Sequence, residues 1–90
     1  MQTRSKEGIL AEMIRTALSP INKTGIMYRA NLSYSQLVRY LELLQDRDLI
    51  QIQRGQWVAT DKGREFLDAY NVILRFVGPD KEVPAVARIV

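Results

Sequence analysis

Apolar residues recur at helical spacing near the start of the chain. The stretch from Ile9 to Leu18 repeats its apolar positions at intervals that fall on one side of a helix with about 3.6 residues per turn. Thr3 and Ser5 are the candidate N-caps, and Ser19-Pro20 ends the helix because the residue before a proline is pushed out of the helical region. We expect this first helix to bury one apolar stripe, made of Ile9, Leu10, Met13, Ile14, Ala17 and Leu18.

A short extended piece from Pro20 to Asn22 leads into a second, short helix. Asn22 or Thr24 can cap this helix, which runs to about Ala30. Asn31 then ends it, because asparagine tolerates a positive φ better than most residues. The residues that this helix turns inward are Ile26, Met27 and Ala30.

The third helix has an explicit start. Ser33 and Gln36 form a capping box, in which each side chain bonds to the other residue's amide, and Leu32 and Leu37 form a hydrophobic staple around it. The helix therefore begins at Tyr34. Its inner face carries Leu37, Leu41 and Leu44, which leaves Ser35, Gln36, Arg39, Glu42 and Asp46 on or near the outer face.

The period then changes from that of a helix to that of a strand. Residues 50–53 alternate apolar and polar, Arg54-Gly55 offers a turn, and residues 57–60 can return as a partner strand. This pattern predicts a short β-hairpin. Thr60 and Asp61 open a last helix, since a negative charge in the first turn is favoured by the helix dipole.

The last helix carries more apolar surface than one face of a small domain needs. It breaks near Gly78-Pro79, which makes it roughly 17 residues, or about 25 Å, long. Exposed apolar stripes on small proteins usually mark an interface, so we expect a homodimer through residues 66–77. The expected interface residues are Phe66, Tyr70, Ile73, Leu74 and Val77. Leu67, Val72 and Phe76 broaden the apolar stripe of this helix. The alternative for Phe66, Leu67 and Tyr70 is that they belong to the core of one chain.

The order of these elements predicts a mainly α fold with a small β-hairpin, a winged helix-turn-helix with a C-terminal dimerisation helix. We expect a single domain over residues 1–90. It divides into a winged helix-turn-helix core (1–60), the last helix (61–77) and a tail (78–90) of unassigned role.

Charge and composition narrow the possible functions. The net charge is +3, and residues 19–64 alone carry seven basic and four acidic residues, so the excess lies in the middle of the chain. A basic middle suits a phosphate backbone, although it can equally be solvated surface. The chain has no cysteine and no histidine, so we expect no metal site, no cofactor and no enzymatic activity. With no secretory signal and no apolar run long enough to span a bilayer, we expect a cytoplasmic, nucleoid-associated protein.

Two motifs carry a resemblance to a known family. The stretch "IMYRANLSYSQL", within residues 24–50, and the later "TDKGREFL", at residues 60–67, resemble small archaeal winged-helix DNA-binding proteins of the ten-kilodalton chromatin-associated type "a" group. The similarity covers roughly residues 5–77. It implies DNA binding and dimerisation through the last helix. More distantly, residues 37–50 look like the recognition-helix segment of multiple-antibiotic-resistance-type regulators, which usually have glycine in place of Asp48.

In a winged helix of this kind, the third helix (about 34–47) enters the major groove of double-stranded DNA and the wing near 54–56 meets the backbone or the minor groove. Arg39 can contact guanine or a phosphate, or be a solvated arginine paired with Glu42 or Asp46. Gln36 can read adenine or be used up by its capping box. The expected DNA contacts are Lys23, Thr24, Tyr28, Arg29, Tyr34, Ser35, Gln36, Arg39, Arg54 and Gln56.

A second function is also compatible with the sequence. The third helix carries Glu42 and Asp46, and Asp48 follows it, so this end would face phosphates unfavourably. A winged helix that docks on protein through its hairpin or its last helix, without direct DNA binding, is therefore the alternative.

Overall fold

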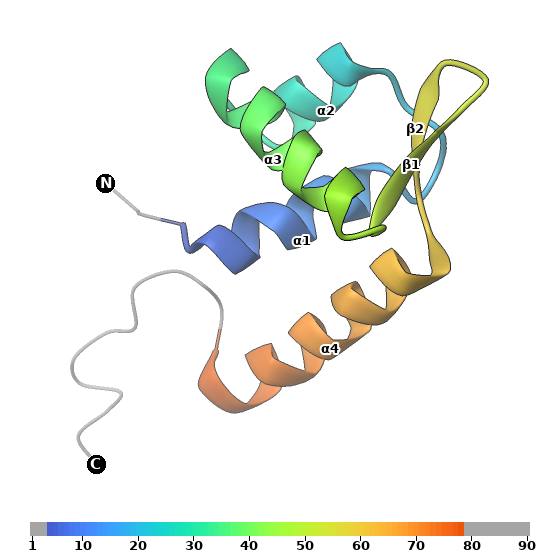
Figure 1. The fold of residues 1–90 in the computed structure, drawn as a ribbon. Coiled ribbons are helices and arrows are strands. Elements are labelled where there is room, and N and C mark those ends of the chain that lie inside the picture. Colours follow the sequence, from blue (N-terminus) through green and yellow to red (C-terminus); the bar gives the residue numbers. More distant parts are fainter. Residues whose placement is uncertain (1–3, 79–90) are drawn as a thin grey trace.

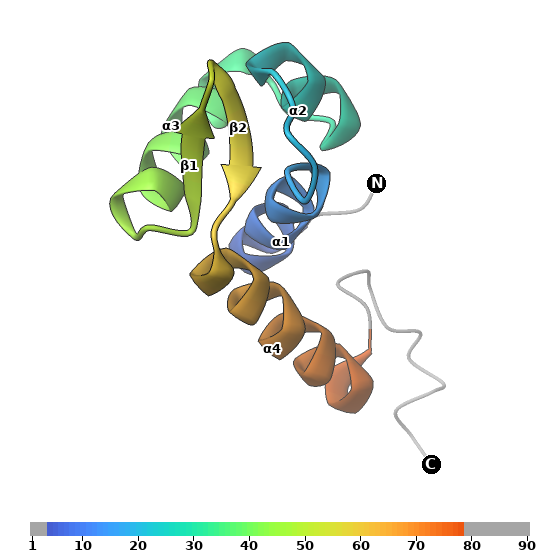
Figure 2. The same cartoon turned by 90° about the vertical axis from the view of Figure 1, so that its right-hand side faces the viewer.

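The structure is a computed structural model that describes residues 4–78. Figure 1 shows α1 between α4 on one side and the α2–α3 pair on the other, with the hairpin at one end of the molecule, and Figure 2 shows the same arrangement from the side. The expected winged helix-turn-helix is confirmed. The elements are α1 (Lys6–Thr16), α2 (Lys23–Arg29), α3 (Tyr34–Asp46), β1 (Ile50–Gln53), β2 (Gln56–Ala59) and α4 (Asp61–Val77).

Polar side chains start all four helices, because each N-cap oxygen accepts a hydrogen bond from an amide three residues later that has no partner within the helix. Ser5 begins α1, Asn22 begins α2 and Thr60 begins α4. At α3 the expected capping box is present in full, so this helix begins at Tyr34 as predicted.

The helices α2 and α3 end in the same way. Each is followed by a residue in the left-handed region, Asn31 with φ 55° and Asp48 with φ 63°, as the sequence predicted for Asn31. The next amide then returns to the carbonyl five residues earlier, which is the Schellman arrangement. These two bonds join Leu32 N–H to the Met27 oxygen at 2.9 Å and Leu49 N–H to the Leu44 oxygen at 2.8 Å.

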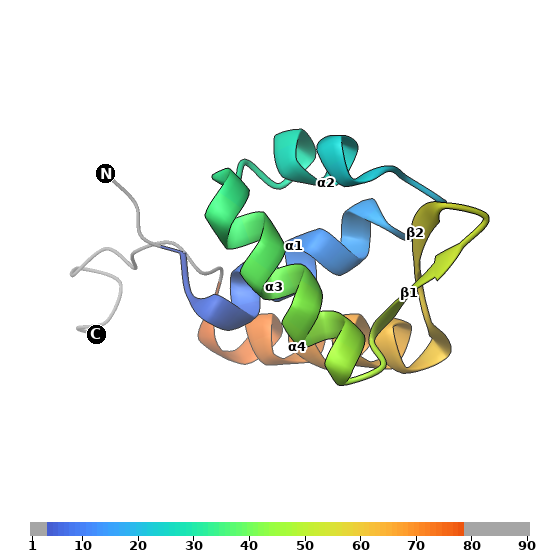
Figure 3. The same ribbon diagram turned by 45° about the horizontal axis from the view of Figure 1, so that its top comes forward.

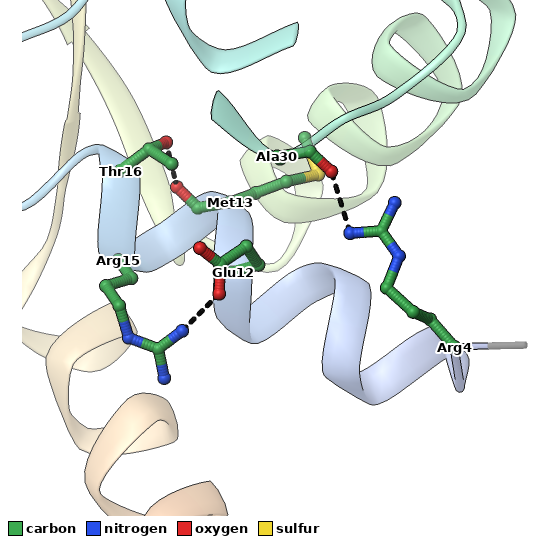
Figure 4. Close-up of polar contacts among 6 residues, drawn as sticks. All are labelled: Arg4, Glu12, Met13, Arg15, Thr16 and Ala30. Atoms are coloured by element: carbon green, nitrogen blue, oxygen red, sulfur yellow. Dashed lines mark hydrogen bonds and ion pairs between the residues drawn. The ribbon is translucent and has the colours of Figure 1, made fainter. Parts of the chain in front are cut away.

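The prediction for the end of α1 was wrong. The helix ends at Thr16, and Leu18 is 42% exposed instead of completing the buried stripe. The Thr16 hydroxyl donates to the Met13 carbonyl at 2.7 Å (Figure 4). The Ala17 carbonyl accepts from the Ala59 amide at 2.8 Å. Because β2 holds Ala17, the chain leaves the helical path before the proline and Leu18 turns to solvent.

The hairpin is held to the helices by one extra rung. Ile21, in the predicted extended piece, exchanges both main-chain hydrogen bonds with Trp57, at 3.0 and 2.8 Å. The turn residues Arg54 and Gly55 have φ of 53° and 78°, as in the type I′ turns that fit the twist of a hairpin. The hairpin projects past the helices (Figure 1). The alternating pattern of β1 did not predict that Ile52 is 51% exposed there.

The core lies between α1, the inner face of α3 and the base of the hairpin. The residues predicted for the inner face of α3 are all buried, namely Leu37, Leu41 and Leu44. Met13, Ile14, Ile26 and Ile50 complete the innermost layer. The outer face of α3 is therefore directed away from the protein.

The first turn of α4 packs tightly on the link between α3 and β1. A Cβ atom on Gly63 would lie 2.1 Å from the Leu49 carbonyl oxygen, so only glycine fits there. Thr60 holds the same link: its hydroxyl donates to the Asp48 carbonyl at 2.7 Å and its amide to the Leu49 carbonyl at 3.2 Å. The start of α4 is thus fixed against the end of α3.

The far half of α4 leaves the core. Leu67 is buried, but Ile73 is 53% exposed, Phe76 is 82% exposed and Val77 is 63% exposed. The helix spans 17 residues and ends at Val77, and the C-cap residue Gly78 has φ 85°, as predicted. The remaining tail lies outside the described residues.

Candidate nucleic-acid interface

The elements that were expected to meet DNA share one side of the molecule. Figure 3, viewed more from above, shows α3 in front, with α2 near the start of α3, the hairpin near its end and α4 behind. The candidate residues on these elements are exposed, except Gln36, which is half-buried. The structure therefore leaves α2, α3 and the hairpin accessible to one partner.

The first half of α3 presents a polar and aromatic outer face. Tyr34 is 64% exposed, and Ser35 and Arg39 are also exposed. Tyr40 is half-buried against the core, and the Arg39 guanidinium carbon lies 5.2 Å from the centroid of its ring. A cation at this distance is attracted to the ring face, which restrains the arginine on the helix surface.

The alternative of a solvated ion pair for Arg39 does not occur in the structure. Within residues 4–78 the ion pairs join Arg15 to Glu12 and Arg64 to Asp61; the first of these is drawn in Figure 4. Neither Glu42 nor Asp46 binds Arg39. Its guanidinium donors are therefore left for a partner, since arginine can only donate.

The hydrogen bonds of the capping box engage Gln36. The side-chain oxygen of Gln36 accepts from the Ser33 backbone amide at 3.0 Å, and the backbone amide of Gln36 donates to the Ser33 hydroxyl at 3.2 Å. Bidentate reading of adenine needs both the oxygen and the amino group of glutamine. While the capping box holds, the Ser33 amide occupies one of the two acceptor positions on that oxygen, and reading of adenine by Gln36 stays a prediction.

The helix α2 and the hairpin add exposed candidates near the two ends of α3. Tyr28 is 73% exposed, and Lys23, Thr24 and Arg29 are exposed along the same short helix. Arg54 and Gln56 are exposed at the hairpin tip. Basic residues at such positions suit contacts with phosphates, which fix the orientation of a protein on DNA without reading sequence.

The second half of α3 has the opposite charge. Glu42 and Asp46 are exposed on this half, as are Arg47 and Asp48 directly after the helix, and carboxylates repel phosphates. The partner of this surface is thus expected to lie over the first half of α3, where Arg39 is the basic group.

Two residues of this region were not among the sequence candidates. Val38 is 42% exposed on α3. Its position could have been predicted from Tyr34, because residues four apart on a helix share a face. Arg4 donates two hydrogen bonds to the turn between α2 and α3, and no sequence pattern indicated that contact.

A separate apolar groove lies between the start of α1 and α4. Its volume is about 270 Å³. All five residues expected at the dimer interface line it, and the rings of Phe66 and Tyr70 stack there with centroids 6.5 Å apart. The lining residues are Ser5, Glu7, Phe66, Ala69, Tyr70, Ile73, Leu74 and Val77.

Other kinds of site find no support in the part of the chain that the structure describes. Residues 4–78 hold no group of three or more aspartate, glutamate, histidine or cysteine residues placed to bind a metal ion. No helix in that same range combines the length and the apolar character that crossing a membrane requires.

Comparison with known proteins agrees with the geometry. Residues 3–77 match the family model described as winged helix-turn-helix. The chain belongs to the winged helix-turn-helix family. This match confirms the fold predicted from the order of helices and hairpin.

One relative and one structural neighbour of this family member are archaeal, as the resemblance implied. The chain is 32% identical over 79 residues to the uncharacterized protein MJ0290 of Methanocaldococcus jannaschii, covering 87% of the chain but only 37% of that relative's length. The crystal structure of Sso10a-2, a DNA-binding protein from Sulfolobus solfataricus, superposes with a TM-score of 0.73 at 18% identity, with 82% of each chain covered. At 18% identity, the likeness to Sso10a-2 shows a shared fold.

Proposed function

We propose that this protein binds double-stranded DNA, as a transcriptional regulator or a chromatin-associated protein, without catalysis or a cofactor. The observation that carries the proposal is the outer face of α3, where Arg39 is exposed, restrained over Tyr40 and unpaired among residues 4–78. The likeness in fold to Sso10a-2, which is described as DNA-binding, supports it. A nucleoid-associated location in the cytoplasm would follow from this binding.

In the proposed complex the first half of α3 enters the major groove. Tyr34, Ser35 and Arg39 would face base edges or phosphates there, because residues near the start of a recognition helix normally meet the bases. Lys23, Thr24, Tyr28 and Arg29 would contact the backbone from α2. Arg54 and Gln56 would do so from the hairpin, or Arg54 would enter the minor groove.

We further propose that two copies associate through α4. The groove beside α1 is apolar, and Ile73, Phe76 and Val77 remain exposed next to it or in it. A second copy of the same helix could cover this surface on both partners at once, as a two-fold interface requires. Dimerisation would also place two α3 helices on one DNA molecule.

Salt dependence of binding tests the proposal. We expect fluorescence anisotropy to detect binding of a mixed-sequence duplex at about 50 mM salt and a large loss of affinity at about 200 mM. If Lys23, Arg29, Arg39 and Arg54 each contact a phosphate, the slope of log K against log salt should be roughly −3 to −4 per protomer, because each contact contributes about −0.9. Absence of binding at the lower salt concentration would refute the proposal.

The alternative function is a protein-docking module. The exposed carboxylates of Glu42, Asp46 and Asp48 favour it, because they lie on or directly after α3. Charge reversal separates the two functions. If both Arg39→Glu and Arg54→Glu leave the cellular function intact, docking on protein becomes the better explanation.

A further inference from the structure

Some carbonyl groups of the turn between α2 and α3 accept hydrogen bonds from amides within the turn, and others do not. The Met27 and Tyr28 oxygens accept from the amides of Leu32 and Asn31, at 2.9 and 3.2 Å. The carbonyls at the C-terminal end of a helix have no partner within the helix. In this turn the carbonyls of Ala30 and Asn31 are bound from outside.

Arg4, in the segment before α1, supplies that partner. Its Nη1 donates to the Ala30 oxygen at 2.7 Å and its Nη2 donates to the Asn31 oxygen at 2.9 Å. Figure 4 shows the side chain reaching from the segment before α1 to Ala30. A guanidinium is a planar fork with donors in fixed positions, so a single side chain can bind two successive carbonyls in one orientation.

The turn at the other end of α3 is held in a similar way. There Thr60 donates to the carbonyls of Asp48 and Leu49. Both ends of α3 are thus fastened through main-chain carbonyls by residues distant in sequence. The Thr60 contact belongs to the tightly packed start of α4, whereas the Arg4 contact is made by one exposed side chain and can be removed without opening the core.

We propose that Arg4 is a positioning residue for DNA binding. By holding the Ala30 and Asn31 carbonyls it fixes the direction in which α3 leaves the turn, and therefore the position of Tyr34, Ser35 and Arg39 relative to DNA. Its guanidinium donates to main-chain oxygens, so Arg4 acts through the turn and makes no phosphate contact. This inference rests on the proposed DNA binding.

Hydrogen exchange tests the positioning without DNA. In Arg4→Ala we expect the amides of Asn31 and Leu32 to exchange about tenfold faster, because charge-assisted hydrogen bonds that support the turn are lost. The amides of Asp48 and Leu49 in the other turn should not change, and neither turn should change in Lys6→Ala, which removes a charge two residues away. Equal acceleration in both turns, or none, would overturn the inference.

Arg4→Lys keeps the positive charge. It provides a second test of the same turn if Arg4→Ala does not fold. An ammonium is a compact point charge on a flexible stem and lacks the fork, so exchange at Asn31 and Leu32 should still rise. A lysine variant whose turn is as protected as that of the natural chain would overturn the inference, since charge alone would then suffice.

DNA titrations complete the test. Arg4→Ala and Arg4→Lys should weaken binding about three- to tenfold while the salt slope stays that of the natural chain. A fall of about 0.9 in the slope of Arg4→Ala would instead identify a phosphate contact and overturn the inference. Full affinity in both variants would also overturn it and leave the proposed function standing. If the natural chain does not bind, the proposed function fails, whatever the exchange rates show.

Discussion

Arg54 holds a backbone conformation that arginine rarely adopts. Its φ of 53° lies in the left-handed region, where the Cβ atom makes the conformation costly for most residues. Asn-Gly is the favoured pair for a two-residue turn of this type, yet the chain has Arg54-Gly55. Strained residues that persist in a structure are commonly found at functional sites, which agrees with a DNA contact at the hairpin tip.

Replacing Arg54 with asparagine should separate stability from binding. We expect Arg54→Asn to raise the free energy of unfolding by up to about 1 kcal/mol, because asparagine adopts this conformation more easily. The same variant should bind DNA more weakly, with a salt slope smaller by about 0.9. Thermal unfolding and anisotropy titration measure the two effects, with Lys6→Ala as the charge-matched control. Unchanged affinity and slope in Arg54→Asn would remove Arg54 from the interface.

At the scale of single residues, the sequence predicted what depends on near neighbours. The Ser33 capping box and the left-handed Asn31 follow from local hydrogen bonding and were confirmed. The need for glycine at Gly63 arises because the Leu49 carbonyl approaches it from another element. The Arg4 contact spans 26 residues. No local pattern could predict either of these two contacts.

At the scale of elements, helix starts were easier to predict than helix ends. A start is set by one capping side chain, whereas α1 ends where β2 binds Ala17, which is a tertiary contact. The strand β1 is similar. Its alternating pattern predicts which face of the strand points inward, but not how far along the strand the core extends. Ile52 is on the inward-facing side with Trp57, its cross-strand partner, yet lies beyond the cover of the helices.

The exposed end of α4 gives the clearest prediction at this scale. Ile73→Glu should convert a dimer into a monomer in analytical ultracentrifugation at micromolar concentration, because it puts a charge into the apolar groove. Folding should be kept, since Ile73 is 53% exposed within one chain. Arg75→Ala, at an exposed position on the same helix, should remain dimeric. A monomeric natural chain, or a dimeric Ile73→Glu variant, would contradict the proposed interface.

At the scale of the whole molecule, two proposed surfaces lie on different sides of α1. The helices α2 and α3 and the hairpin form the candidate DNA side, and α4 lies behind them (Figure 3). The tight contact of Gly63 with the end of α3 joins the two sides at one place. A dimer built on α4 would therefore set the spacing of the two α3 helices through a rigid connection.

The sequence alone predicted which elements form the candidate DNA side and which helix forms the candidate dimer interface, because the order of elements and their apolar faces can be read from the residue pattern. It did not predict that Arg39 would lie over Tyr40, because that contact depends on side-chain geometry. The candidate DNA residues remain predictions until a complex is measured.

The most direct measurement of the central claim is an NMR titration of the labelled chain with a short duplex at low salt. The account predicts that amide chemical shifts change in α2, in the first half of α3 and at residues 53–56, while those of residues 66–77 do not. Shifts confined to α4, or none at any position, would contradict it.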